Sequence, residues 1–153
     1  MTALETGREA PDFALKDQFG QTVRLSDFRG TSGVLLVFFP FAFSGICTGE
    51  LCELRDDLKA FEAGGVQVVG VSCDPMFALR AWGETEGYDF PLLSDFWPHG
   101  EVARAYGVLD EDKGMAVRGS FLVDAAGVLR WSVVNGPGEA RDLDAYRKAV
   151  AEL

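Results

Sequence analysis

Two cysteines five positions apart carry the clearest chemical signal in the chain, in the stretch FFPFAFSGICTGELC from Phe38 to Cys52. The first of them, Cys47, follows an apolar run and a small turn, and the residues after it have helical spacing, so we expect it in the first turn of a helix. A helix start carries unpaired N–H groups and a partial positive charge, and both favour a thiolate over a thiol. Because the thiolate is the nucleophilic form, this pattern predicts a reactive Cys47.

The residues around Cys47 suit a reactive sulfur. Gly45 allows a tight turn, and Ser44 places a hydroxyl where it can cap the helix or touch the sulfur or a substrate oxygen. Pro40 ends the preceding apolar run and stiffens the entry to the turn. At about 100° per residue, Cys47 falls within the apolar stripe of the helix, so we expect its sulfur to lie in a pocket. Four phenylalanines are expected to keep water from that pocket: Phe38, Phe39, Phe41 and Phe43.

The other two cysteines and the one histidine lead to different expectations from those for Cys47. Cys52 falls outside the apolar stripe, roughly beside Asp56 and Lys59, so simple core packing is less expected for it than for most cysteines. Cys73 ends a buried apolar run and is expected to be structural. His99 has no cysteine or histidine at zinc-ligand spacing and is expected in a loop or at a helix entry.

Composition excludes several classes of protein. The chain has 153 residues, 48% of them hydrophobic, which suits one domain over residues 1–153 with a sizeable core. Its formal net charge of -10 and its lack of a basic stripe argue against a nucleic-acid partner. No run is long enough to span a membrane, and the first residues do not resemble a secretory signal, so we expect a cytoplasmic protein. Three cysteines are too few for a disulfide scaffold.

Strand and helix patterns alternate along the chain, which predicts an α/β fold with a central mixed sheet, helices on both faces and an N-terminal hairpin. Sites in such folds commonly lie beyond the carboxyl ends of strands, where Cys47 is expected. The expected elements are a hairpin at 13–28, a strand at 33–40, a helix at 47–65, a strand at 66–74, a helix at 75–87, an extended segment at 90–95, a short helix at 99–107, a hairpin at 118–134 and a helix at 139–153.

The motif PFAFSGIC, from Pro40 to Cys47, matches the P-x-x-x-[TS]-x-x-C signature of peroxiredoxins. APDFAL near the start, FPLLSDFWPHGEVARAYGV in the middle and RGSFLVD late in the chain are also similar to that family. The stretches FFPFAFSGICTGEL and PLLSDFWPHG most closely resemble the actinobacterial alkyl hydroperoxide reductase E group, whose members use one cysteine. The resemblance extends across nearly the whole chain.

The resemblance implies a thioredoxin-like fold and an antioxidant thiol peroxidase that reduces hydrogen peroxide and organic hydroperoxides without metal, haem or flavin. Carried over position by position, it makes Cys47 the peroxidatic cysteine and Arg118 the active-site arginine, with Ser44 and Pro40 at the other signature positions. It further suggests that the acidic side chain of Glu50 orients Arg118. The family also suggests a homodimer, and the aromatic residues of DFWPHG either form a dimer contact or cover the core.

Cys52 departs from the one-cysteine pattern. The C-x4-C spacing instead resembles the bacterioferritin comigratory protein group, in which the second cysteine resolves the sulfenic acid as a disulfide. In an intact helix the two Cα atoms would be about 8–9 Å apart, beyond disulfide reach, so the first turn would have to unwind. The alternative is attack by an external thiol, supplied by thioredoxin, a mycoredoxin or mycothiol, and Cys73 is a further candidate for resolution.

Two other functions compete with a peroxidase. A thioredoxin-like disulfide reductase would need a C-x-x-C motif, which this chain does not contain. A non-catalytic redox-sensing or binding domain on the same fold would keep its function when Cys47 is replaced by serine, whereas a peroxidase would lose nearly all of its activity.

Overall fold

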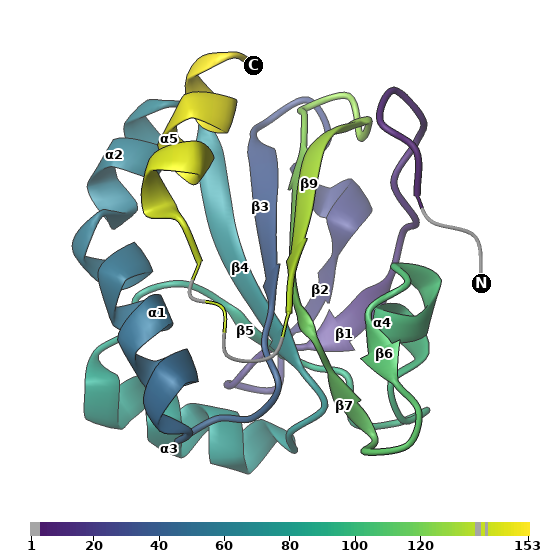
Figure 1. Ribbon diagram of the computed structural model, residues 1–153, viewed down its shortest axis with the longest axis vertical. Coiled ribbons are helices and arrows are strands. Elements are labelled where there is room, and N and C mark those ends of the chain that lie inside the picture. The colour runs from purple at the N-terminus through teal and green to yellow at the C-terminus, as the bar shows by residue number, and fades with distance from the viewer. Residues whose placement is uncertain (1–3, 137–138, 140) are drawn as a thin grey trace.

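A mixed sheet forms the centre of the computed structural model, which describes residues 4–136, 139 and 141–153, and of Ile46 and Cys47 the backbone alone. Within this part of the chain, seven strands pair in the order β2-β1-β5-β4-β3-β8-β9 (Figure 1). Their bounds are β1 (Ala14–Lys16), β2 (Thr22–Arg24), β3 (Gly33–Phe38), β4 (Val66–Ser72), β5 (Leu92–Ser94), β8 (Arg118–Val123) and β9 (Leu129–Asn135).

The central strands β3 and β4 run parallel, in a register that pairs Gly33 with Val66 and Phe38 with Val71. Every residue of β3 is buried, as a continuous apolar run requires of a strand that is covered on both faces. β5 continues the parallel set beside β4, whereas β8 pairs antiparallel with β3, and β1 pairs antiparallel with β2 and β5. The predicted mixed sheet and N-terminal hairpin are therefore confirmed.

Helices cover both faces of the sheet, as predicted, but unequally. Figure 1 shows α1, α2 and α5 on one side and α4 on the other. The first face packs side chains such as Leu54, Trp82 and Tyr146 against the sheet, and the second packs Leu25, Val102 and Tyr106. The helices are α1 (Gly45–Asp56), α2 (Leu58–Ala63), α3 (Met76–Glu86), α4 (Glu101–Ala105) and α5 (Leu143–Ala151), with a 3-10 turn η1 at Leu25–Phe28.

The helix predicted at 47–65 differs from the structure in two respects. It begins two residues earlier, at Gly45, and it is interrupted at Asp57 between α1 and α2. The Asp57 carboxylate accepts a hydrogen bond from Arg147 Nε of α5 at 2.7 Å, so the interruption coincides with a contact to another helix. Leu58 and Phe61 still reach the core after the break.

A small hairpin in the structure was not predicted from the sequence. Its strands β6 (Leu109–Asp110) and β7 (Met115–Ala116) have two residues each, too few to show a periodic pattern. Among the described residues, no helix has the length and apolar character needed to cross a membrane.

Candidate active site

The end of β3 leads into the turn that carries the predicted nucleophile. α1 begins at Gly45, so the backbone of Cys47 lies in its first turn, as predicted. Ser44 directly precedes the helix, and its carbonyl oxygen accepts the Thr48 N–H at 2.9 Å. The side chain of Cys47 lies outside the described residues, so the expectation that its sulfur points into a pocket stays a prediction.

The turn between β3 and α1 is held from the neighbouring strand. The Ala42 N–H donates to Asp74 Oδ2 at 2.8 Å, and the Ser72 hydroxyl donates to the same oxygen at 2.7 Å. Phe43 adopts a positive φ of 68°, a conformation that a bulky residue keeps only when its surroundings enforce it. Asp74 thus anchors the turn that precedes α1, a role that was not predicted from the sequence.

The four phenylalanines that were expected to shield Cys47 differ in burial and in direction. Phe38 and Phe39 are fully buried, but they point into opposite faces of the sheet because consecutive residues of an extended chain alternate. Phe41 and Phe43 are 44% and 57% exposed. Because the side chain of Cys47 lies outside the described residues, the expectation that these four side chains keep water from it stays a prediction.

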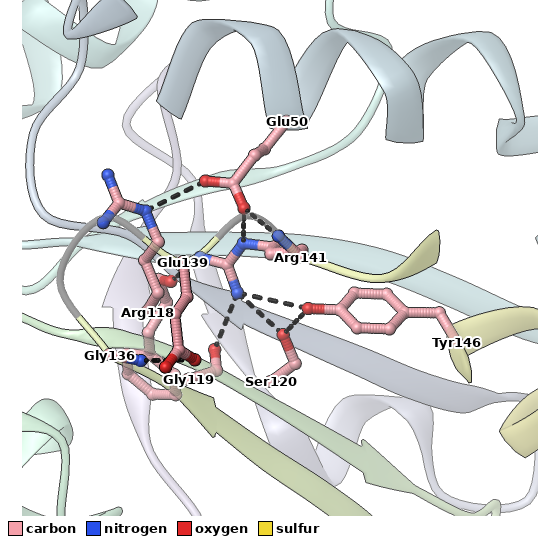
Figure 2. A network of polar contacts seen from close by, with 9 residues as sticks. Glu50, Arg118, Gly119, Ser120, Gly136, Glu139, Arg141 and Tyr146 are labelled. Atoms are coloured by element: carbon pink, nitrogen blue, oxygen red, sulfur yellow. Dashed lines mark hydrogen bonds and ion pairs between the residues drawn. The ribbon is translucent and has the colours of Figure 1, made fainter. Parts of the chain in front are cut away.

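Glu50 and Arg118 come together from α1 and β8. Glu50 Oε1 lies 2.9 Å from Arg118 Nε in an ion pair whose two side chains are largely buried (Figure 2). Glu50 follows Cys47 by three residues, which is just under one helical turn. The contact expected between Glu50 and Arg118 is thus present, and it lies beside the first turn of α1.

Arg141 is a second buried guanidinium that sequence analysis did not identify. Its backbone N–H donates to Glu50 Oε2 at 2.9 Å, and its Nε lies 3.2 Å from the same oxygen. Its terminal nitrogens donate to Ser120 Oγ at 2.8 Å and to Tyr146 Oη at 3.3 Å (Figure 2). They also donate to the Phe38 carbonyl oxygen. No motif marks this arginine, because its partners come from four separate elements.

The Glu50 carboxylate therefore contacts two buried guanidinium groups. Two positive charges and one negative charge leave a net positive charge within the cluster of Glu50, Arg118 and Arg141. Such a cluster beside a helix start favours an anion there, since buried charges are weakly screened. The arrangement can stabilise a thiolate, and also negative charge that develops on a departing oxygen.

A cavity of about 310 Å³ opens beside Arg118 and Pro40. Its apolar lining comes from Met115, Val117 and Val134, and the β6–β7 hairpin supplies part of one wall. The predicted signature residue Pro40 and the predicted arginine therefore line the same hollow.

Cys52 is half-buried at the edge of the core rather than on an open face. Its Sγ lies 3.4 Å from Glu86 Oε2 and 3.5 Å from Tyr88 Oη. The sequence-based placement outside the apolar stripe was only partly right, because the end of α3 and Tyr88 cover that side of α1.

Cys73 is buried, as predicted, directly after β4. Burial, followed by the nearby carboxylates of Asp95 and Asp74, raises the pKa of its thiol to about 11. His99 precedes α4, and its Nε2 lies 2.6 Å from the Gly114 carbonyl oxygen, consistent with the predicted helix entry. Across the described residues, no group of three or more His, Cys, Asp or Glu side chains is placed to hold a metal ion.

Comparison with known proteins identifies the family. The model of the AhpC/TSA family matches residues 6–132 of the chain. This chain belongs to the AhpC/TSA family. It is similar to alkyl hydroperoxide reductase E of Mycobacterium tuberculosis, with 49% identity over 150 residues that cover 98% of each chain.

Solved structures of peroxiredoxins share the fold. The crystal structure of peroxidoxin BcpB from Mycobacterium tuberculosis matches with a TM-score of 0.86 and 33% identity, over 97% of this chain and 95% of that one. The crystal structure of Enterococcus faecalis AhpC matches with a TM-score of 0.88 and 30% identity, over 99% and 93%. The chain is thus a peroxiredoxin with a thioredoxin-like fold, and as such an enzyme, a thiol-dependent peroxidase.

Proposed function

We propose that Cys47 is the peroxidatic cysteine of this peroxiredoxin. Its thiolate attacks one oxygen of the hydroperoxide, a sulfur–oxygen bond forms, and the oxygen–oxygen bond breaks. The departing oxygen takes up a proton and leaves as an alcohol, or as water when the substrate is hydrogen peroxide. The sulfur remains as a sulfenic acid.

The buried cluster of Glu50, Arg118 and Arg141 is the observation that carries this proposal. Arg118 stabilises the Cys47 thiolate and the charge on the departing oxygen, and Glu50 holds the guanidinium in place. Ser44 supplies a hydroxyl at the helix start, and Pro40 fixes the path of the chain into the turn. No metal or organic cofactor takes part in these steps.

Hydrogen peroxide and organic hydroperoxides are the substrates we propose. The cavity beside Pro40 and Arg118 supports the organic class, because Met115, Val117 and Val134 offer an apolar wall for a hydrocarbon chain. Its volume of about 310 Å³ accommodates a small organic group beside the peroxide.

We propose that Cys52 resolves the sulfenic acid as a Cys47–Cys52 disulfide, which a thiol reductant of the thioredoxin, mycoredoxin or mycothiol type then reduces. Both backbones belong to α1, so the first turn must open before the sulfurs can meet. Burial and the raised pKa of Cys73 favour Cys52 over Cys73 in this role. Direct attack of an external thiol on the sulfenic acid is the alternative route.

A homodimer and a cytoplasmic location complete the proposal, without a nucleic-acid or membrane partner. Exposed aromatic side chains lie in the turn before α1, at the start of α3 and in the segment after β5. Asp74 connects the first of these segments to the end of β5, because its carboxylate accepts the Ala42 N–H and its carbonyl oxygen accepts the Ser94 hydroxyl at 2.7 Å. An aromatic surface of this kind is typical of protein–protein contacts. The exposed aromatics are Phe41 and Phe43 before α1, Phe77 in α3, and Phe96 and Trp97 after β5.

Stopped-flow tryptophan fluorescence after mixing with hydrogen peroxide or an organic hydroperoxide tests the assignment. Wild-type protein should show a fast oxidation phase that Cys47→Ser abolishes, while Cys73→Ser keeps it. A fast phase that survives in Cys47→Ser would show that another group reacts with peroxide.

A further inference from the structure

Cys52 lies within an organised set of polar groups that the peroxide-reducing step does not use. Its Sγ is 3.4 Å from Glu86 Oε2, at the end of α3, and 3.5 Å from Tyr88 Oη, in the segment that follows. Both distances are within hydrogen-bond range for sulfur. The set brings a carboxylate and a hydroxyl to one thiol.

The number of donor hydrogens on each group determines which group donates and which accepts in these contacts. A thiol and a phenol each carry one donor hydrogen, and an ionised carboxylate carries none. The Tyr88 hydroxyl donates to the Thr48 carbonyl oxygen at 3.1 Å, which engages its only hydrogen. The Cys52 thiol therefore donates to Glu86, and the transfer of its proton to that carboxylate needs no rearrangement.

Arg55 holds the carboxylate-bearing end of α3 against α1. Its Nη1 donates to the main-chain carbonyl oxygen of Glu86, and its positive charge interacts with Cys52 and with Tyr88. Among the described side chains, the charged and titratable groups that face Cys52 are thus Glu86, Tyr88 and Arg55. A nucleophile next to a base, with a third group that positions the base, is the usual arrangement for activating a weak nucleophile.

The position of Cys52 in α1 suits this chemistry. Thr48 is held by Tyr88 and by Trp82, whose Nε1 donates to Thr48 Oγ1 at 3.1 Å. When the turn that carries Cys47 opens, Cys52 stays on the part of α1 that packs against α3, beside Glu86. If the opening includes Thr48, the Tyr88 hydroxyl is released and can donate to the Cys52 sulfur, 3.5 Å away, as negative charge builds on it.

We propose that Glu86 is the proton acceptor for Cys52 in the disulfide-forming step, an inference that rests on the proposed resolving role of Cys52. The proton of the Cys52 thiol passes to the Glu86 carboxylate as the sulfur attacks the sulfur of the Cys47 sulfenic acid. The sulfur–sulfur bond forms, the sulfur–oxygen bond breaks, and the departing hydroxide takes the proton back from Glu86 to leave as water. The sulfenic sulfur is reduced and the Cys52 sulfur is oxidised, so no further oxidant is needed.

Rapid quench with an alkylating reagent, followed by intact mass spectrometry after one equivalent of hydrogen peroxide, resolves the two steps. The sulfenic acid is one oxygen heavier than the reduced chain, and the disulfide is two hydrogens lighter. In Glu86→Gln the sulfenic acid should accumulate, and disulfide formation near pH 7 should slow about 100-fold, the usual effect of losing a general base. Glu86→Asp, which keeps a carboxylate further from the sulfur, should give an intermediate rate.

The pH profile separates proton transfer from a structural effect. Without a base only thiol that is already ionised can attack, so the rate of disulfide formation should depend more steeply on pH in Glu86→Gln than in wild type. Glu84→Gln is the matched control, because Glu84 is exposed on the same helix and pairs with Arg80 at 3.2 Å; this variant should form the disulfide at the wild-type rate.

The results that would contradict the role of Glu86, the role of Cys52 and the assignment of Cys47 differ from one another. Equal disulfide rates and equal pH slopes in wild type and Glu86→Gln would overturn the role of Glu86 while Cys52 remains the resolving cysteine. A sulfenic acid that persists in wild-type protein would remove both the resolving role and this inference, and would leave the peroxidase intact. A chain that gains no oxygen at all would overturn the assignment of Cys47 as well.

Discussion

Glu50 Oε1 and Arg118 Nε are 2.9 Å apart although the two residues are separated by 68 positions in the sequence. Glu50 belongs to α1, the helix that carries Cys47, and Arg118 is the first residue of β8, so this ion pair joins α1 to β8. The same carboxylate also contacts Arg141 at 3.2 Å. Arg118, which we propose as the active-site arginine, is therefore positioned by a side chain of the helix that carries Cys47.

Replacing Arg118 by alanine should slow the oxidation of Cys47 by several orders of magnitude. The guanidinium stabilises both the thiolate and the departing oxygen, so its loss should raise the pKa of the Cys47 thiol and remove transition-state stabilisation. Stopped-flow fluorescence gives the rate of oxidation, and the pH dependence of that rate reports the pKa of the Cys47 thiol. Arg118→Lys keeps the charge and should retain more activity than alanine; an unchanged rate in Arg118→Ala would remove this residue from the mechanism.

Replacing Glu50 by glutamine should destabilise the protein by about 3–5 kcal/mol, because two buried guanidinium groups lose their counter-charge. Urea unfolding followed by circular dichroism measures the change. Glu53→Gln, on the exposed face of the same helix, is the control and should change the free energy of unfolding by less than about 0.5 kcal/mol. Equal stabilities for the two variants would mean that the cluster does not depend on its carboxylate.

Replacing Cys52 by serine should leave the first oxidation step fast and abolish the Cys47–Cys52 disulfide. The reason is that Cys52 acts only after the sulfenic acid has formed. Peptide mass spectrometry after one equivalent of peroxide should detect the disulfide in wild type and a sulfenic acid in the variant. Wild-type protein without this crosslink would instead indicate that an external thiol attacks the sulfenic acid.

Cys73 should resist alkylation by iodoacetamide in the folded protein below about pH 10, since burial and two nearby carboxylates raise its pKa to about 11. A raised pKa stabilises the folded state fully at pH values below the ordinary thiol pKa of about 8.5, and this stabilisation is lost as the pH rises through about 11. Cys73→Ala should therefore lose less stability than wild type between about pH 9 and 11. Labelling of Cys73 at pH 8 as fast as in urea-unfolded protein would contradict the raised pKa.

Local patterns in the sequence were enough to predict the order of the main elements. Continuous apolar runs predicted β3 and β4, and helical spacing with glycine or proline at the ends predicted α3, which begins after Pro75 and ends before Gly87. The stretch from Pro40 to Cys47 predicted that Cys47 lies in the first turn of a helix, as the structure confirms, because a helix start is determined by only a few residues. These features depend on neighbours in the chain, which the sequence displays directly.

Tertiary structure alone decided which distant groups surround those residues. Arg141 contacts Glu50, Ser120, Tyr146 and Phe38, and no local pattern brings these residues together. The contact of Cys52 with Glu86 likewise arises because α3 ends against α1, whereas helical phase by itself left that side of α1 open. Helix phase and strand alternation give the direction of a side chain, but the partner that meets it depends on how whole elements pack, and that packing is decided by the entire core.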